Sequence, residues 1–232
     1  ARGVRLEGQT GLIRAAVAPT PVEEAQKLLS ATERTLQRTE RHRRIQDLTL
    51  HRTVDDDLLR AALAGSLLVL GEPGSGKTGA LHELVRALID RGERVVFLAA
   101  DHLQAASLGA LRDDLRLGHE LHDVMAGMTA DPDSRAFLVI DALDKAPETA
   151  MSTYLCLIDD AIRSLDRWHV VAAMRTFDAS HRRDVQALFP GEPVQGTSDP
   201  ALPRERVRHL KVDLLDLADG SEARTRVGEA LP

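Results

Sequence analysis

Short apolar runs alternate along the chain with longer segments in which apolar residues recur at helical spacing. Unbroken apolar runs are typical of strands buried on both faces of a parallel sheet. Five runs are expected to be strands, at 67–70, 95–99, 137–140, 170–173 and, less regularly patterned, 207–214. Between the first two runs, apolar residues repeat at helical positions from Leu81 to Ile89, and Gly92 supplies a stop. The alternation predicts a mainly parallel five-stranded sheet with helices on both faces.

Two helices are predicted ahead of the first strand. Pro21 followed by two acidic residues is typical of a helix start, and we expect this helix to reach about Asp47. A second helix is expected at 54–64, ending at Gly65. The predicted organisation is therefore an N-terminal helical extension at 1–52, an α/β domain at 53–219 and a polar tail at 220–232.

Composition narrows the class of protein. A chain of 232 residues with 43% hydrophobic and 28% charged residues suits one α/β domain with an extension. The net charge of -6 argues against a surface devoted to nucleic acid. Cys156 is the single cysteine, and its apolar neighbours predict a buried thiol in a reducing compartment. No run is long enough to cross a bilayer, so we expect a cytoplasmic protein without a membrane partner.

The stretch GEPGSGKT follows the first predicted strand and precedes a predicted helix. It matches the pattern G-x-x-x-x-G-K-[ST] in the strand-to-helix context that this pattern requires. Glycines let backbone N–H groups converge on phosphate oxygens, and the helix presents its positive end to the same charge. Lys77 is expected to reach the β- and γ-phosphates and Thr78 to bind Mg²⁺. The predicted phosphate-binding residues are Gly71, Glu72, Pro73, Gly74, Ser75, Gly76, Lys77, Thr78 and Gly79.

Two carboxylates are candidates for binding the metal ion and for polarising the attacking water. Asp141 ends the third predicted strand, and ligands in open α/β sheets bind beyond the carboxyl ends of the strands, so we expect Asp141 beside the glycine loop as a Mg²⁺ ligand. Three residues later, Asp144 either acts at the site, by polarising the attacking water or holding a water on the metal, or caps the helix that starts near Pro147. The residues leave these roles open.

One basic residue is a candidate phosphate contact, and two missing sequence motifs indicate which base the nucleotide carries. Arg175 ends the fourth predicted strand, where it either contacts the γ-phosphate or pairs with Asp178 at the surface. The chain contains no asparagine, which excludes the guanine-reading N-K-x-D motif. The residue three positions after Asp141 is Asp144 instead of the glycine of the GTPase D-x-x-G pattern. Adenine is therefore the expected base.

GEPGSGKT, LVIDALDKA and VVAAMRTFD, in this order, resemble the STAND-type P-loop ATPases and, among them, the NACHT-like group of signalling and anti-phage defence proteins. The resemblance covers about residues 55–215. It implies a three-layer αβα sandwich with sheet order 5-1-4-3-2, Mg-ATP bound as a switch with slow hydrolysis, nucleotide-dependent homo-oligomers, and effector or sensor domains outside this chain. It assigns Lys77 and Thr78 to Walker A, Asp141 to Walker B, Asp144 to the second acid and Arg175 to the sensor.

The chain departs from this resemblance in two ways. Lys145 stands where the family often has a glutamate, and no helical lid fits after Leu214. Because the chain also opens with Ala1 instead of methionine, we expect a fragment of a larger protein. A scaffold that binds nucleotide without hydrolysing it is the first alternative.

The second alternative is an AAA+-type ATPase associated with DNA. It would use the arginines of the first helix, although Glu33 and Glu40 lie among them and a solvated surface is the simpler interpretation. The basic residues concerned are Arg34, Arg38, Arg41, Arg43 and Arg44. His119 and His122 are spaced as a metal pair but have no further ligand nearby in the sequence, and Trp168 is expected to be a packing residue.

Overall fold

The structure is a computed structural model. It describes residues 21–40, 44–45, 48–49, 53–103, 105–131, 133–194, 200, 202 and 206–214. Its helices are α1 (Pro21–Thr39), α2 (Thr53–Ala64), α3 (Lys77–Asp90), α4 (Leu108–Asp114), α5 (Leu121–Met128), α6 (Glu148–Arg163), α7 (Thr176–His181) and α8 (Arg183–Leu188), with a 3-10 turn η2 at Leu143–Lys145. Its strands are β1 (Arg44–Ile45), β2 (Leu48–Thr49), β3 (Leu67–Gly71), β4 (Arg94–Ala99), β5 (Ala136–Asp141), β6 (Trp168–Arg175) and β7 (His209–Lys211).

Five parallel strands form the central sheet, in the order β4-β5-β6-β3-β7. Numbered along the sheet-forming part of the chain, this order is 2-3-4-1-5, which confirms the expected order read from the opposite edge. The last strand, His209–Lys211, is shorter than the run from which it was predicted. In the sheet, β6 lies between β3 and β5. Because these three strands are parallel, their carboxyl ends lie at the same edge of the sheet.

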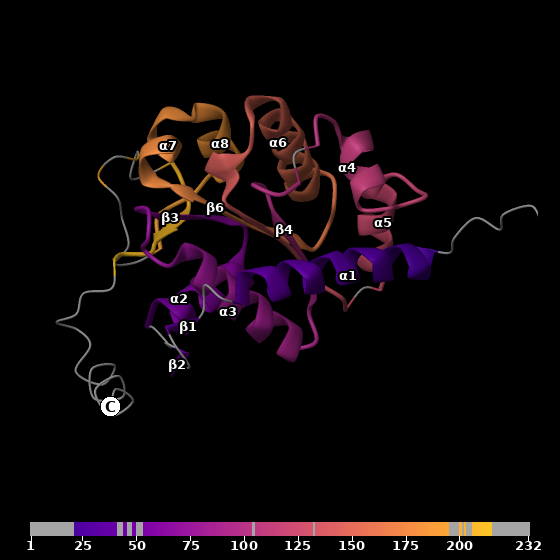
Figure 1. The fold of residues 1–232 in the computed structure, drawn as a ribbon, viewed down its shortest axis with the longest axis horizontal. Coiled ribbons are helices and arrows are strands. Elements are labelled where there is room, and N and C mark those ends of the chain that lie inside the picture. Colours follow the sequence, from indigo (N-terminus) through magenta and orange to yellow (C-terminus); the bar gives the residue numbers. More distant parts are fainter. Residues whose placement is uncertain are drawn as a thin grey trace, which may run out of the picture.

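Side chains of each strand alternate between two apolar cores, because successive residues of a strand point to opposite faces. In β3, Leu68 and Leu70 join the core under α4, α5 and α6, while Leu67 and Val69 join the core under α2 and α3. Helices therefore cover both faces of the sheet (Figure 1). This arrangement is the predicted three-layer sandwich.

Helix α1 lies along the β4 edge of the sheet, where no further strand pairs among the described residues (Figure 1). The Thr32 hydroxyl donates to Val95 O at 2.8 Å and accepts from Phe97 N at 2.9 Å. One side chain thus satisfies backbone groups that an unpaired edge strand would leave exposed. The buried Glu24 carboxylate also accepts from Gly118 N at 2.7 Å, so two polar side chains fix α1 to the domain through three hydrogen bonds.

The prediction that the first helix reaches about Asp47 is wrong. Helix α1 ends at Thr39, whose hydroxyl bonds to Thr35 O and Leu36 O within the last turn. Beyond it, β1 and β2 pair antiparallel, with Ile45 opposite Leu48. The β-branched residues in these short strands favour extended backbone, which the helical pattern did not take into account.

The prediction of a buried Cys156 thiol is also wrong. Cys156 is exposed on α6. In a helix, consecutive residues point in different directions, so an apolar run cannot be buried throughout. Tyr154, Leu157 and Ile158 face the core, and Cys156 points to solvent.

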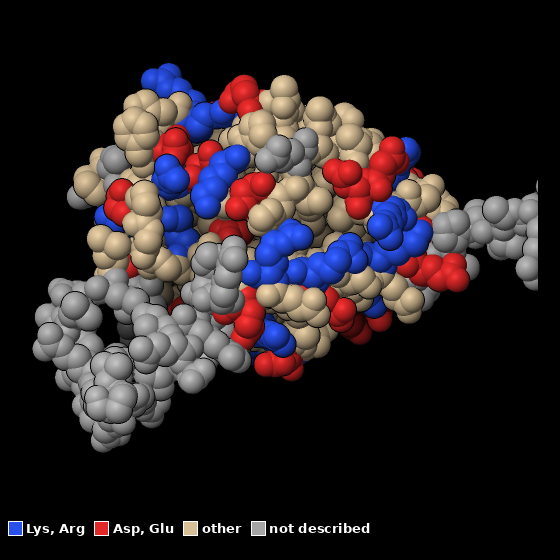
Figure 2. All heavy atoms as spheres, viewed as in Figure 1, with Lys and Arg blue, Asp and Glu red and all other residues tan. Residues whose placement is uncertain are grey.

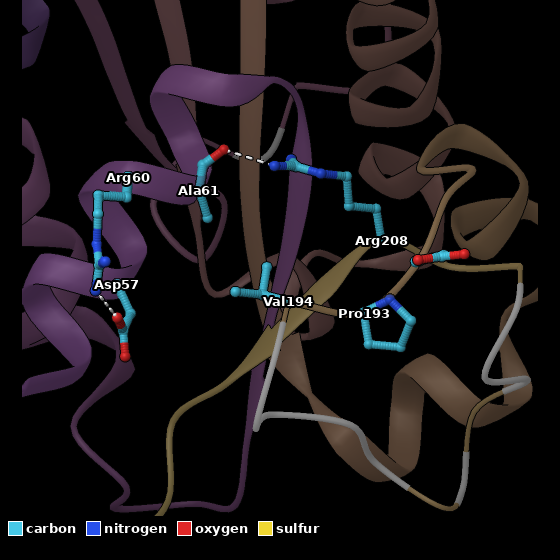
Figure 3. Close-up of a pocket in the computed structure, with 7 residues that line it drawn as sticks. Asp57, Arg60, Ala61, Pro193, Val194 and Arg208 are labelled. Carbon is cyan, nitrogen blue, oxygen red and sulfur yellow. Dashed lines mark hydrogen bonds and ion pairs between the residues drawn. The ribbon is translucent and has the colours of Figure 1, made fainter.

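Three basic side chains bind the carbonyl groups at the end of α2, where the chain enters β3. Arg208 donates from Nη1 to Gly65 O and Ser66 O, both at 2.8 Å, and from Nη2 to Ala61 O at 2.8 Å. Figure 3 shows the guanidinium reaching the Ala61 carbonyl beside a cavity of about 500 Å³. Because the last turn of α2 carries no basic residue of its own, Arg208 supplies the cap from a distant segment.

Arg135, the residue before β5, and His169 on β6 complete this cap. Arg135 donates to Leu63 O at 3.3 Å, and Nδ1 of His169 lies 2.9 Å from Ala62 O. The His169 ring packs edge-on against Phe137, with ring centroids 5.4 Å apart. Burial lowers the pKa of His169, and the charges of the two arginines lower it further. Donors at the amino ends of β5, β6 and β7 thus stabilise this end of the sheet.

Candidate functional site

The candidate site lies at the carboxyl end of the sheet, around the loop that joins β3 to α3. Gly71 ends β3 and is paired in register with Arg175 on β6. A side chain on Gly71 would approach Ser75 Oγ and the Val212 carbonyl oxygen to 2.5 Å, so only glycine fits there. Gly74 and Gly76 have φ angles of 81° and 90°, which favour glycine. The glycines of the motif are therefore required by the backbone path.

The loop leaves the amino end of α3 open. Among the described residues, no side chain caps this helix at Gly76, and Ala80 N donates to Gly76 O at 3.0 Å. Glu72, Pro73 and Gly74 are exposed, while Ser75 is buried under them. An uncapped helix start that faces solvent is a ready anion-binding site.

Lys77, the first residue of α3, folds back over the loop. Its Nζ donates to Gly71 O at 2.7 Å and to Glu72 O at 3.0 Å. Burial lowers the pKa of Lys77, while the nearby carboxylates of Asp144 and Asp141 favour its charged form. The ammonium group therefore lies between the loop and the two acids that the sequence singled out.

Asp141 ends β5 and is buried. Burial raises the pKa of its carboxyl, and hydrogen bonds from Thr78 and from the Ala142 amide at 2.8 Å partly offset that effect. Ala142 adopts a left-handed conformation with φ of 54°, which is costly for a residue other than glycine. The sharp turn after β5 thus aims the carboxylate at Thr78, the residue after Lys77.

Asp144 lies in η2 and forms an ion pair with Arg175. The Arg175 Nε atom is 3.1 Å from Asp144 Oδ2, and the Asp144 side chain is only 4% exposed. The helix-cap alternative is wrong, because α6 begins after Pro147 and no side chain caps it. The surface pair of Arg175 with Asp178 is also wrong, since the ion-pair partner of Arg175 is Asp144.

Sequence reasoning missed Asp101, which follows the end of β4 at the same edge. Its carboxylate is 4.0 Å from Lys145 Nζ and 3.7 Å from His102 Nε2. Lys145 therefore extends toward the neighbouring strand. The strand-end position that identified Asp141 applies equally to Asp101, so the same rule could have found it.

The residues of this edge fit a nucleotide and Mg²⁺. Thr78 and Asp141 are hydrogen-bonded to each other, so a hydroxyl and a carboxylate oxygen are close enough to share one hard cation. Lys77 and the amino end of α3 offer positive charge on the loop side. Arg175 offers a second cation across the β3–β6 register. The structure thus brings together the loop, the strand-end residues Asp141 and Arg175, and Asp144 in η2, as the sequence predicted.

Other candidates lie away from this edge. His122 pairs with Asp160 at 2.8 Å, His119 precedes α5, and the described residues hold no cluster of metal ligands. Trp168 is buried and its Nε1 donates to Met125 O at 3.2 Å, as expected of a packing residue. The cavity beside Arg208 is at the amino end of β3 (Figure 3). Across the described residues, no helix combines the length and apolarity needed to cross a membrane.

The basic residues of α1 form a mixed surface. Figure 2 shows a row of basic side chains along α1 with acidic side chains beside it. Arg34 and Arg38 are exposed, and so are Glu23 and Glu33 on the same helix. Arg41 and Arg43 lie outside the described residues, and Arg44 lies in β1. A solvated surface remains the simpler interpretation of this helix.

No protein-family model matches the chain. It is 44% identical over 80 residues to the signal recognition particle receptor FtsY of Mycobacterium leprae, across 34% of this chain and 17% of that protein. It is 41% identical over 98 residues to the FtsY of Mycobacterium tuberculosis (strain H37Rv), across 42% of this chain and 22% of that protein. The aligned regions span about a fifth of these relatives, so they say nothing of the whole receptor's activity.

Solved structures with a similar arrangement include DnaA bound to AMPPCP from Aquifex aeolicus and Cdc6p from Pyrobaculum aerophilum. The DnaA match has a TM-score of 0.46 at 16% identity and covers 76% of this chain and 50% of that chain. The Cdc6p match has a TM-score of 0.42 at 19% identity and covers 59% and 43%. These scores carry no argument about function. Strand order, glycine loop and strand-end carboxylate together give the chain the α/β fold of the P-loop NTPases.

Proposed function

We propose that the chain binds Mg-ATP and hydrolyses it slowly, as the nucleotide-binding core of a STAND or NACHT-like switch. One observation carries this proposal. The amino end of α3, the Lys77 ammonium group and the Asp141, Asp144 and Arg175 side chains lie at one edge of the sheet. A phosphate chain needs positive charge along its length and a carboxylate for its metal, and both are present there.

Binding falls to the loop and to the first turn of α3. Backbone N–H groups from Gly74 to Thr78 would surround the phosphates, with Lys77 moving from the Gly71 and Glu72 carbonyls to the β- and γ-phosphates. Thr78 and Asp141 would hold Mg²⁺. When bound, the ion neutralises charge that develops on the phosphate oxygens.

Hydrolysis falls to Asp144 and Arg175. A water oxygen would attack the γ-phosphorus while the bond to the oxygen bridging the β- and γ-phosphates breaks, giving ADP and phosphate. Asp144 would orient the water and accept its proton, and Arg175 would stabilise the charge on the γ-phosphate. ATP is the proposed nucleotide because the sequence lacks the asparagine of the guanine-reading motif.

The switch role extends the proposal beyond the site. The resemblance to STAND proteins supports nucleotide-dependent homo-oligomers and effector or sensor domains outside this chain. It also supports slow turnover, in keeping with Lys145 in the place where the family often has a glutamate after the second acid. A scaffold that binds nucleotide without turnover would use the same loop.

Phosphate release from ATP by the purified chain tests hydrolysis. Asp144→Asn should lower the turnover about 1000-fold, within the range for losing a general base, while nucleotide stays bound. Asp178→Asn is the matched control, because Asp178 is a nearby acid outside the ion pair, and it should leave turnover unchanged. Bound nucleotide with no release by the parent chain would contradict the enzyme and support the scaffold.

A further inference from the structure

Asp144 forms an ion pair with Arg175 and also lies near the Lys77 ammonium group. Its side chain is 4% exposed, and Arg175 Nε is 3.1 Å from its Oδ2 atom. A carboxylate so far removed from water is costly unless it is paired. Asp144 therefore holds the Arg175 guanidinium on the inner side of the site.

Arg175 has hydrogen-bond donors that are available to a ligand. Its side chain is 45% exposed, and the atom that contacts Asp144 is Nε. Within the described part of the chain, neither of its terminal nitrogens makes a hydrogen bond or an ion pair. The N–H groups of these two nitrogens stay available for an oxygen-rich ligand on the solvent side.

The phosphate loop supplies such a ligand position. Gly71, the first residue of the loop, is the register partner of Arg175 on the adjacent strand. Lys77 lies close enough to both Asp144 and Arg175 for their charges to act on its ammonium group. A phosphoryl group held by Lys77 would therefore lie beside the free side of the Arg175 guanidinium.

We propose that Asp144 is a specificity-determining residue that acts through Arg175 and favours nucleoside triphosphate over diphosphate. The inference rests on the proposed function and adds a role for Asp144 that is independent of proton transfer. A half-exposed arginine loses side-chain freedom when it binds phosphate. Because Asp144 already restricts the guanidinium, part of that entropic cost is met before the γ-phosphate arrives.

A double-mutant cycle separates this role from simple repulsion between Asp144 and phosphate. The proteins are the parent chain, Arg175→Gln, Asp144→Asn and the double variant. For each, calorimetry with excess Mg²⁺ gives the affinities for ADP and for a non-hydrolysable ATP analogue, whose ratio is the triphosphate preference. The effect of Arg175→Gln is measured once with Asp144 present, against the parent chain, and once with asparagine at 144, against Asp144→Asn. Direct repulsion from Asp144 is the same in both members of each pair, so it cancels in the comparison.

Arg175→Gln should reduce the triphosphate preference about five-fold more when Asp144 is present than when residue 144 is asparagine, which corresponds to ordering one long side chain. The same cycle with Asp178→Asn in place of Asp144→Asn should show equal reductions. If Arg175→Gln does not fold, Arg175→Lys replaces it, since lysine keeps the charge but lacks the planar group of donors.

Each outcome decides the matter. Equal reductions in the two backgrounds, or a larger one with asparagine at 144, would overturn the inference while nucleotide binding by the parent chain left the proposed function intact. The larger reduction with asparagine would mean that Asp144 competes with phosphate for Arg175. If the parent chain bound neither nucleotide, the proposed function would fail first and the inference with it.

Discussion

The two ends of the central sheet use charged side chains in different ways. At the amino end, Arg208 and Arg135 donate to backbone carbonyls of the α2–β3 connection, and His169 bonds there too. At the carboxyl end, Asp144 and Arg175 pair with each other, and Lys77 bonds to its own loop. The cations at the amino end are bonded to carbonyls of the α2–β3 connection, whereas Lys77 and Arg175 lie beside the uncapped start of α3, where a phosphate could share or replace their partners. The first end stabilises the fold, and the second is where we propose that nucleotide binds.

The two ends should also differ in what their charges contribute to stability. Burial lowers the pKa of Arg208 and so penalises its charge, but its removal would leave three carbonyl acceptors without a donor, so the guanidinium stabilises the folded chain. A buried carboxylate such as Asp141 has the opposite effect, since burial raises its pKa and penalises its charged form. Substitutions at the two ends should therefore change stability in opposite directions.

Arg208→Met should have the largest effect on stability. Three hydrogen bonds from a charged donor would be lost, and the free energy of unfolding should fall by about 4 kcal/mol. Urea unfolding followed by circular dichroism measures this change. The affinity for ATP should stay the same in the folded variant, because Arg208 lies at the opposite end of β3 from the loop.

Arg60→Met is the matched control for Arg208. Figure 3 shows both arginines beside the same cavity, but Arg60 is 76% exposed and pairs with Asp57 at the surface. Its loss should change the free energy of unfolding by less than about 1 kcal/mol. Similar losses for Arg60 and Arg208 would contradict the special role given to the amino end.

Asp141→Asn should stabilise the chain by about 1 kcal/mol at pH 7, because it removes a buried charge while an amide oxygen can still accept from Ala142. The pKa of Asp141 is raised in the folded state, so the folded chain binds more protons and loses stability as the pH rises from about 4. The gain in the variant should therefore shrink on acidification. Unfolding curves at pH 7 and pH 4.5 measure it, and a destabilised variant would refute the comparison.

His169→Gln should have the smallest effect, visible mainly as a change in pH dependence. Burial lowers the folded-state pKa of His169, so its contribution is complete above the unfolded value of about 6.5 and is lost as the pH falls below that value. The glutamine variant should lose less stability than the parent between pH 7 and pH 5.5. Parallel losses in thermal unfolding across this range would show that His169 does not report on the amino end.

The sequence predicted the carboxyl end better than the amino end. The glycine loop, Asp141 and Arg175 were found because each follows directly on an unbroken apolar strand, and parallel strands bring such ends together. The α2 cap was not predicted. Arg208 bonds to Ala61 across 147 positions, and no local pattern indicates which carbonyl a distant arginine will reach.

Helical surfaces were the other source of error. Cys156 lies in an apolar run, yet the turn of α6 carries it to the solvent side. The end of α1 depends on hydroxyl contacts in its last turn and on the pairing of β1 with β2, which a helical repeat does not encode. Strands buried on both faces give unbroken apolar runs, so they were predicted from the sequence. Helices are buried on one side only, so their exposed residues and their ends were harder to predict.

Calorimetric titration of the purified chain with ATP and Mg²⁺, beside Lys77→Ala, tests the central claim most directly. We expect the parent chain to bind, with an affinity about 100-fold weaker in the variant. The variant lacks the ammonium group that would make charged contacts with two phosphates in the parent chain. Thermal unfolding of the two proteins should be similar, because Lys77 is bonded to its own loop. Equal affinity in both proteins, or no binding by the parent chain, would contradict the assignment of this edge as a nucleotide site.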